Sequence, residues 1–90
     1  MNKFDEIVKG VQKLHKRGYV YEYFENTDKE TGIRYINIKL GEWTVSGAKG
    51  DGYKTINKIR DEARKRDLYF EDHSVYNHVY VYEKNPLDVF

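Results

Sequence analysis

Residues 2 to 18 alternate between apolar and polar positions with the period of an α-helix. The apolar positions share one face of that helix and are Phe4, Ile7, Val8, Val11 and Leu14, with lysines on the opposite face. Asn2 is a suitable N-cap, and Gly18 is typical of a helix end. The pattern predicts an amphipathic first helix between Asn2 and Gly18.

Two residues inside this helix bear on function. His15 falls on the apolar face, and we interpret it as a packed histidine at the edge of the core rather than as a ligand or an acid–base group. Gly10 lowers helix stability by about 1 kcal/mol relative to alanine, so it can mark a close approach of another element.

The next two stretches alternate with a period of two, which is typical of β-strands. Residues 19–25 place Tyr19, Tyr21 and Tyr23 on one side, and residues 33–40 alternate apolar side chains with Tyr35, Asn37 and Lys39. The polar segment 26–32 between them, which ends in glycine, predicts a turn. We therefore expect a β-hairpin that carries Tyr19, Tyr21, Tyr23 and Tyr35 on one face.

Residues 41–66 pass from a short apolar stretch through a glycine-rich segment into a basic helix. The pattern predicts a third strand over 42–46, with Trp43 and Val45 toward the core, and then a helix from about Gly52 to Arg66. Asp51 is the expected N-cap of this helix. Its buried stripe consists of Ile56, Ile59 and Ala63, and lysines occupy the opposite face.

The remaining residues predict a second hairpin, formed by strands over 68–71 and 78–83 and ended by Pro86. The fold class is therefore α+β: a single domain over 1–90, with an antiparallel sheet and two helices packed on one face. Its parts are a helix, three strands and a helix over 3–66, a C-terminal hairpin over 67–84 and a tail over 85–90. Two placements of the second hairpin stay open: it either extends the sheet or covers the tyrosines.

Composition narrows the classes of function. The chain has no cysteine, no signal-peptide pattern and no apolar run long enough for a membrane span, so we expect a cytoplasmic protein without a membrane partner. The net charge is only +1, but residues 49–66 carry seven basic and three acidic side chains, whereas residues 67–90 carry one and five. A local basic patch is thus expected, rather than a uniformly basic protein.

The candidate chemical motifs are weak. Residues 47–52 place three glycines between a strand and a helix, but they lack the Gly-Lys-Ser/Thr ending of a phosphate loop, and we expect no cofactor. His73 and His78 lie close in sequence without a recognisable spacing for a third ligand, so we expect no metal. The two serines, Ser46 and Ser74, lack the context of a nucleophile. The sequence therefore favours a protein that is not an enzyme.

The order of elements resembles the double-stranded-RNA-binding domain over residues 3–66. The matching features are Gly32 in the first turn, the alternating apolar residues of 36–40, the loop 47–52, and Lys54 with Lys58 in the second helix. The same order is similar to that of small mRNA-interferase toxins, whose catalytic Gly-Ser-His segment has no counterpart here. The first resemblance implies binding of nucleic acid.

Two hypotheses for function follow. The first is a protein-binding regulator or inhibitor, of the accessory kind found on phages and other mobile elements and acting as a monomer or small homo-oligomer. Its candidate contacts are Tyr19, Tyr21, Tyr23, Tyr35, Tyr80 and Tyr82. The second is a nucleic-acid-binding module that contacts phosphates through the second helix. Its candidate contacts are Lys49, Lys54, Lys58, Arg64 and Lys65.

Overall fold

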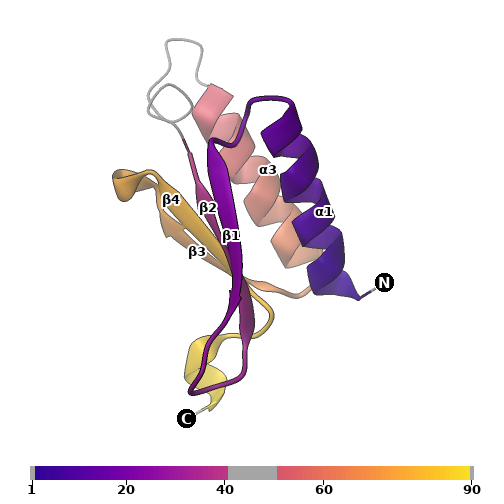
Figure 1. Cartoon of the computed structure of the whole chain (residues 1–90), viewed down its shortest axis with the longest axis vertical. Coiled ribbons are helices and arrows are strands. Elements are labelled where there is room, and N and C mark those ends of the chain that lie inside the picture. Colours follow the sequence, from indigo (N-terminus) through magenta and orange to yellow (C-terminus); the bar gives the residue numbers. More distant parts are fainter. Residues whose placement is uncertain (1, 41–50, 90) are drawn as a thin grey trace.

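The computed structural model describes residues 2–40 and 51–89, with the side chains of 51–53 and 89 excluded (Figure 1). Two α-helices and four strands account for most of this part of the chain. In chain order they are α1 (Lys3–Lys16), β1 (Glu22–Thr27), β2 (Arg34–Lys39), α3 (Asp51–Lys65), β3 (Tyr69–His73) and β4 (His78–Tyr82). Short 3₁₀ helices, η1 (Ser74–Tyr76) and η2 (Pro86–Val89), follow β3 and β4.

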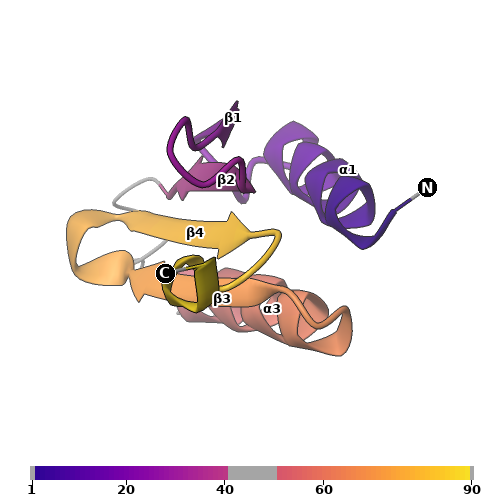
Figure 2. The same cartoon turned by 90° about the horizontal axis from the view of Figure 1, so that it is seen from below.

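The four strands form one antiparallel sheet with the order β1-β2-β4-β3. The two hairpins join through β2 and β4, where Ile38 is paired with Val79. The second hairpin therefore extends the first sheet and does not cover it (Figure 2). This settles the alternative that the sequence left open, because strand pairing between hairpins depends on contacts far apart in the chain.

Both helices pack on the same face of the sheet and run antiparallel to each other (Figure 1). Their apolar stripes meet the inward-facing side chains of β2 and β4 in one core. Its most deeply buried large members are Phe4, Val11, Ile36, Ile38, Val79 and Val81. The predicted α+β class and the packing of two helices on one sheet face are confirmed.

The ends of α1 follow from its capping residues. The Asn2 side-chain oxygen accepts a hydrogen bond from the backbone N–H of Asp5 at 2.8 Å, which satisfies one free donor of the first turn. At the other end, Gly18 has a φ of +84°, a conformation that a residue with a Cβ rarely adopts. The predicted first helix is thus confirmed, together with its cap.

The turn between β1 and β2 is stabilised by Asp28. Its carboxylate accepts hydrogen bonds from the backbone N–H groups of Glu30 (2.8 Å) and Thr31 (3.1 Å), and Gly32 takes a φ of +72°. The hairpin is confirmed, but β1 begins at Glu22, three positions later than the predicted strand. Tyr19 and Tyr21 accordingly precede the strand.

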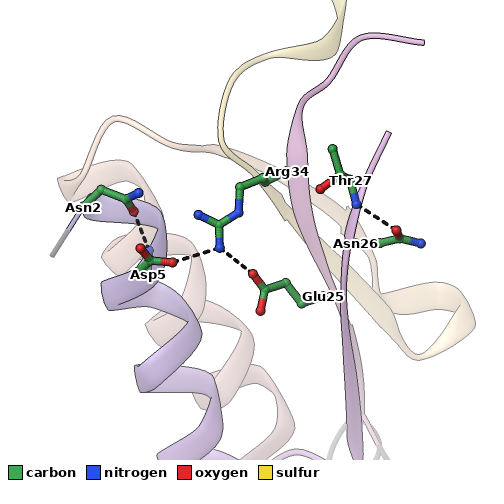
Figure 3. A network of polar contacts seen from close by, with 6 residues as sticks. All are labelled: Asn2, Asp5, Glu25, Asn26, Thr27 and Arg34. Atoms are coloured by element: carbon green, nitrogen blue, oxygen red, sulfur yellow. Dashed lines mark hydrogen bonds and ion pairs between the residues drawn. The ribbon is translucent and has the colours of Figure 1, made fainter. Parts of the chain in front are cut away.

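Arg34 links this hairpin to the start of α1 (Figure 3). Its guanidinium donates to Asp5 at 2.9 Å and to Glu25 at 2.5 Å, and it lies 4.8 Å from the centroid of the Phe4 ring. The hydrogen bonds to Glu25 and Asp5 raise the pKa of Arg34. One side chain thus holds three elements in register.

Several predictions fall on residues outside the described part of the chain. They are the third strand over 42–46 with Trp43 and Val45, residues 47–50 of the glycine-rich loop, and Lys49 as a nucleic-acid contact. The helix predicted from about Gly52 is present and begins at Asp51, and the side chain that was expected to cap it lies outside the described part of the chain. None of the described helices is both long and apolar enough to cross a bilayer.

Candidate binding surface

The sheet face opposite the helices carries a cluster of aromatic rings. In β2 and β4, the buried side chains alternate with Tyr35, His78, Tyr80 and Tyr82. Pairing of β3 with β4 adds Tyr69 beside Tyr82, and His73 beside His78. We call these six residues, Tyr35, Tyr69, His73, His78, Tyr80 and Tyr82, the aromatic face. Both α-helices lie on the opposite face of the sheet (Figures 1 and 2).

The rings of the aromatic face contact one another in a continuous network around Tyr80. The centroid of the Tyr80 ring lies 5.3 Å from that of His73, 6.0 Å from Tyr82 and 6.4 Å from both Tyr35 and His78. Tyr82 also lies 5.4 Å from Tyr35 and 5.9 Å from Tyr69. Aromatic pairs in such arrangements contribute about 0.5–1.5 kcal/mol each beyond area burial, so the rings stabilise one another's positions on the sheet.

Polar groups lie between and beside the rings. His78 Nδ1 is 3.1 Å from the Asn37 side-chain oxygen, and His73 Nε2 pairs with Glu71. Five of the six rings, all but Tyr69, line a shallow depression of about 410 Å³ together with Asp28, Glu71 and Tyr76. The face therefore combines large apolar area with hydrogen-bonding groups at fixed positions, which is the composition of many protein interfaces.

The charge on this face is low. Lys39 is the only lysine or arginine that the four strands present on it, and its Nζ lies 3.7 Å from Glu22 and 5.2 Å from the Phe24 ring centroid. The described carboxylates on or beside the face are Glu22, which pairs with Lys39, Glu71, which pairs with His73, and Asp28, which lines the depression. A face without surplus cations offers little to a phosphate backbone.

Tyr82 is the most strongly perturbed group of the face. Burial raises the pKa of Tyr82 to about 12, and the negative charge of Glu71 adds to the effect. The shift therefore affects the charge of this hydroxyl only above about pH 10, where an unperturbed tyrosine would begin to ionise.

The structure brings together three of the six predicted tyrosines, Tyr35, Tyr80 and Tyr82. The prediction that Tyr23 shares their face is wrong. Tyr23 pairs with Ile38 and packs against the core, with its ring 5.4 Å from that of His15. The register of the hairpin causes this, because directly paired residues point to the same face.

The other two predicted tyrosines, Tyr19 and Tyr21, lie before β1. They are 40% and 67% exposed and are not part of the ring network. Any role for them in binding stays a prediction. The reading of His15 as a packed residue at the core edge fits its contact with Tyr23, although the histidine itself is exposed.

Sequence reasoning missed Tyr69, His73 and His78 as members of the face. The signal was present, since Tyr69, Glu71 and His73 alternate as one side of a strand. What the sequence lacked was the register of β3 on β4. That register depends on the connection between them, where η1 is followed by Asn77 with a φ of +64°.

The predicted nucleic-acid contacts lie on another side of the molecule. Lys54, Lys58, Arg64 and Lys65 are exposed on α3, in the helical layer and away from the aromatic face. Lys49 lies outside the described residues. No set of three or more histidine, aspartate or glutamate side chains in 2–40 and 51–89 is arranged to hold a metal ion.

Comparisons of the chain with protein-family models, curated proteins and solved structures found no match. The function is therefore argued from the geometry of the described surfaces.

Proposed function

We propose that this chain is a non-catalytic protein-binding module whose main contact surface is the aromatic face. The observation that supports this best is the network of six rings on the sheet face opposite the helices, where the charge is low. Tyrosine supplies large contact area at a small cost in conformational entropy and is enriched among the residues that dominate binding energy. Tyr80, at the centre of the network, is the expected hot spot.

Truncation of Tyr80 tests this proposal. Tyr80→Ala should lose a partner from an extract of the source cells that the wild-type chain retains, and Gln12→Ala, at an exposed position of α1 in the other layer, should retain it. With the purified partner, Tyr80→Ala should weaken Kd by about 30-fold, the equivalent of a 2 kcal/mol hot spot. Tyr80→Phe keeps the ring and should bind within a few-fold of wild type.

The fold of each variant is checked by circular dichroism, because the Tyr80 side chain points away from the core and its loss should leave the core intact. Equal retention of the partner by wild type and by a folded Tyr80→Ala variant would contradict the role of the aromatic face.

A second candidate function is nucleic-acid binding by α3. The observation in its favour is that Lys54, Lys58, Arg64 and Lys65 are all exposed on one helix. Labelled duplex RNA, duplex DNA and single strands, titrated at 50 and 200 mM salt, separate the two functions. Steeply salt-dependent affinity that is lost in Lys54→Glu/Lys58→Glu but kept in Tyr80→Ala would favour nucleic acid. Absence of binding at about 10 μM in 50 mM salt would exclude it.

A further inference from the structure

A second surface lies in the helical layer. The antiparallel helices α1 and α3 leave a groove of about 180 Å³ between them, which we call the interhelical groove. Ile7, Val11 and Ile59 contribute apolar lining. Sites for small molecules usually measure about 300–1,000 Å³, so this volume suits the anchoring side chains of a docked helix better than a complete small ligand.

Gly10 lies in the lining of this groove, in the middle of α1. Apart from proline, glycine favours a helix least. A Cβ built on Gly10 has no described neighbour within 4 Å apart from the adjacent residues and the backbone of the helix itself. No described contact within the chain therefore explains why this position is a glycine. The backbone of a partner that approaches α1 closely would explain the glycine, since any other residue would fill that space with its Cβ.

The charge of the groove points to the chemistry of the occupant. Its lining contains four cationic and two anionic side chains, so it carries a net charge of +2. Arg66 pairs with both anions, Glu6 (2.8 Å) and Glu62, and the bond from Arg66 is the largest influence that lowers the pKa of Glu62. The other three cations are Lys13, Arg17 and Lys58.

Among the described residues, these three cations form no ion pair, although Lys58 contributes to the field at Glu62. They come from both helices: Lys13 lies in α1, Arg17 is its C-cap residue and Lys58 lies in α3. A partner helix that inserts an apolar stripe into the groove would therefore form ion pairs with these cations through carboxylates on both sides of the stripe. Self-association through this groove is disfavoured, because it would place two surfaces that each carry a net charge of +2 against each other.

We propose that the interhelical groove docks an amphipathic helix of another protein, with an apolar stripe at i, i+3/i+4 and i+7 flanked by acidic residues. The site is independent of the aromatic face and lies on the opposite layer. The probe is a fluorescein-labelled peptide of about 18 residues, with leucines at the stripe and glutamates beside it. Two control peptides replace its glutamates by lysine or its leucines by serine.

Anisotropy titrations with the full chain test the proposal. We expect the acidic peptide to bind with a Kd in the micromolar range and both control peptides to bind at least tenfold more weakly. Lys13→Glu/Lys58→Glu should weaken binding at least tenfold, whereas Lys29→Glu/Lys84→Glu, which makes the same charge changes at exposed residues outside both α-helices, should change it less than twofold. Tyr80→Ala should bind like wild type, which separates this site from the aromatic face.

Gly10→Leu is the decisive variant, because it fills the groove while it improves helix propensity. Its melting temperature should equal or exceed that of wild type, by up to about 4–8 °C, and its affinity for the peptide should fall at least tenfold. Undiminished binding to a folded Gly10→Leu chain, equal binding of the lysine peptide, or no binding of the acidic peptide at about 1 mM would overturn the proposal.

Discussion

Tyr82 of β4 lies between its two pairing partners, Tyr35 of β2 and Tyr69 of β3. Its hydroxyl belongs to a half-buried ring, and burial is the main cause of its raised pKa. The same crowding that makes the aromatic face a continuous surface therefore makes one of its hydroxyls hard to ionise. Close packing of the rings thus accounts for both the ring network and the raised pKa of Tyr82.

The raised pKa predicts a pH dependence of stability. Below pH 10, Tyr82 is protonated in both the folded and the unfolded chain, so it adds no pH dependence. Between pH 10 and the folded-state pKa of about 12, the unfolded chain loses the proton more readily, and the free energy of unfolding must fall. Urea unfolding at pH 9 to 12 should show this decline, and Tyr82→Phe should reduce it.

Tyr21→Phe is the matched control, since it removes a hydroxyl outside the aromatic face and leaves Tyr82 in place. It should keep the wild-type slope. An unchanged slope in Tyr82→Phe would show that burial does not hold this proton.

At the scale of single elements, local chemistry decides where each helix and turn ends. Asn2 caps α1, and the Asp28 carboxylate accepts hydrogen bonds from backbone N–H groups of the β1–β2 turn. Gly32 completes that turn with a φ of +72°. These residues act within a few positions of the sequence, which is why a pattern of residue types was sufficient to place them.

Gly32→Ala should lower the free energy of unfolding by about 1–2 kcal/mol, because a Cβ disfavours positive φ. Nothing lies within 4 Å of a Cβ built there, so the backbone conformation alone is responsible. Urea denaturation measures the change. Gly32→Asn should lose less than Gly32→Ala, since asparagine tolerates this conformation better. Equal losses would point to a cause other than φ.

At the scale of the whole molecule, Arg34 connects elements that the chain separates. It joins Asp5 of α1 to Glu25 of β1, and its guanidinium lies over Phe4. The ion pairs are partly exposed and so contribute little individually, whereas the three contacts together fix the first hairpin against the helical layer.

Arg34→Met should lower the free energy of unfolding by about 1–2 kcal/mol, from the lost ion pairs and the lost cation–π contact together. Arg60→Met is the control, because the only ion pair described for Arg60 is with its neighbour Asp61, at 3.4 Å, and its loss should be under about 0.5 kcal/mol. In a double-mutant cycle with Asp5→Asn, the effects of Arg34→Met should not add. Strict additivity would show that the two side chains do not interact.

The arrangement of layers also places the two proposed binding surfaces apart. The aromatic face lies on one side of the sheet, and the interhelical groove lies in the helical layer on the other side. Two partners could therefore bind together without competing. The low charge of the first surface and the positive charge of the second make their expected partners chemically different.

The extent to which the binding surface was predictable follows from its residues. Tyr80 and Tyr82 alternate within one strand, so their common face followed from the period of two. Tyr23 was placed on the wrong face because its strand pairs in a register that puts it opposite Ile38. A shift of one residue in register reverses every side chain of a strand, and the local sequence contains no information on that shift.

The sequence by itself determined the two α-helices, both hairpins, the α+β class and the N-cap of α1, because periodicity and caps are properties of neighbouring positions. Only the tertiary structure decided that β4 pairs with β2, that the aromatic rings of three strands form one network, and that Gly10 opens onto a groove between two helices. Each of these depends on contacts between residues far apart in the chain, whose pairing is set by how the whole core packs.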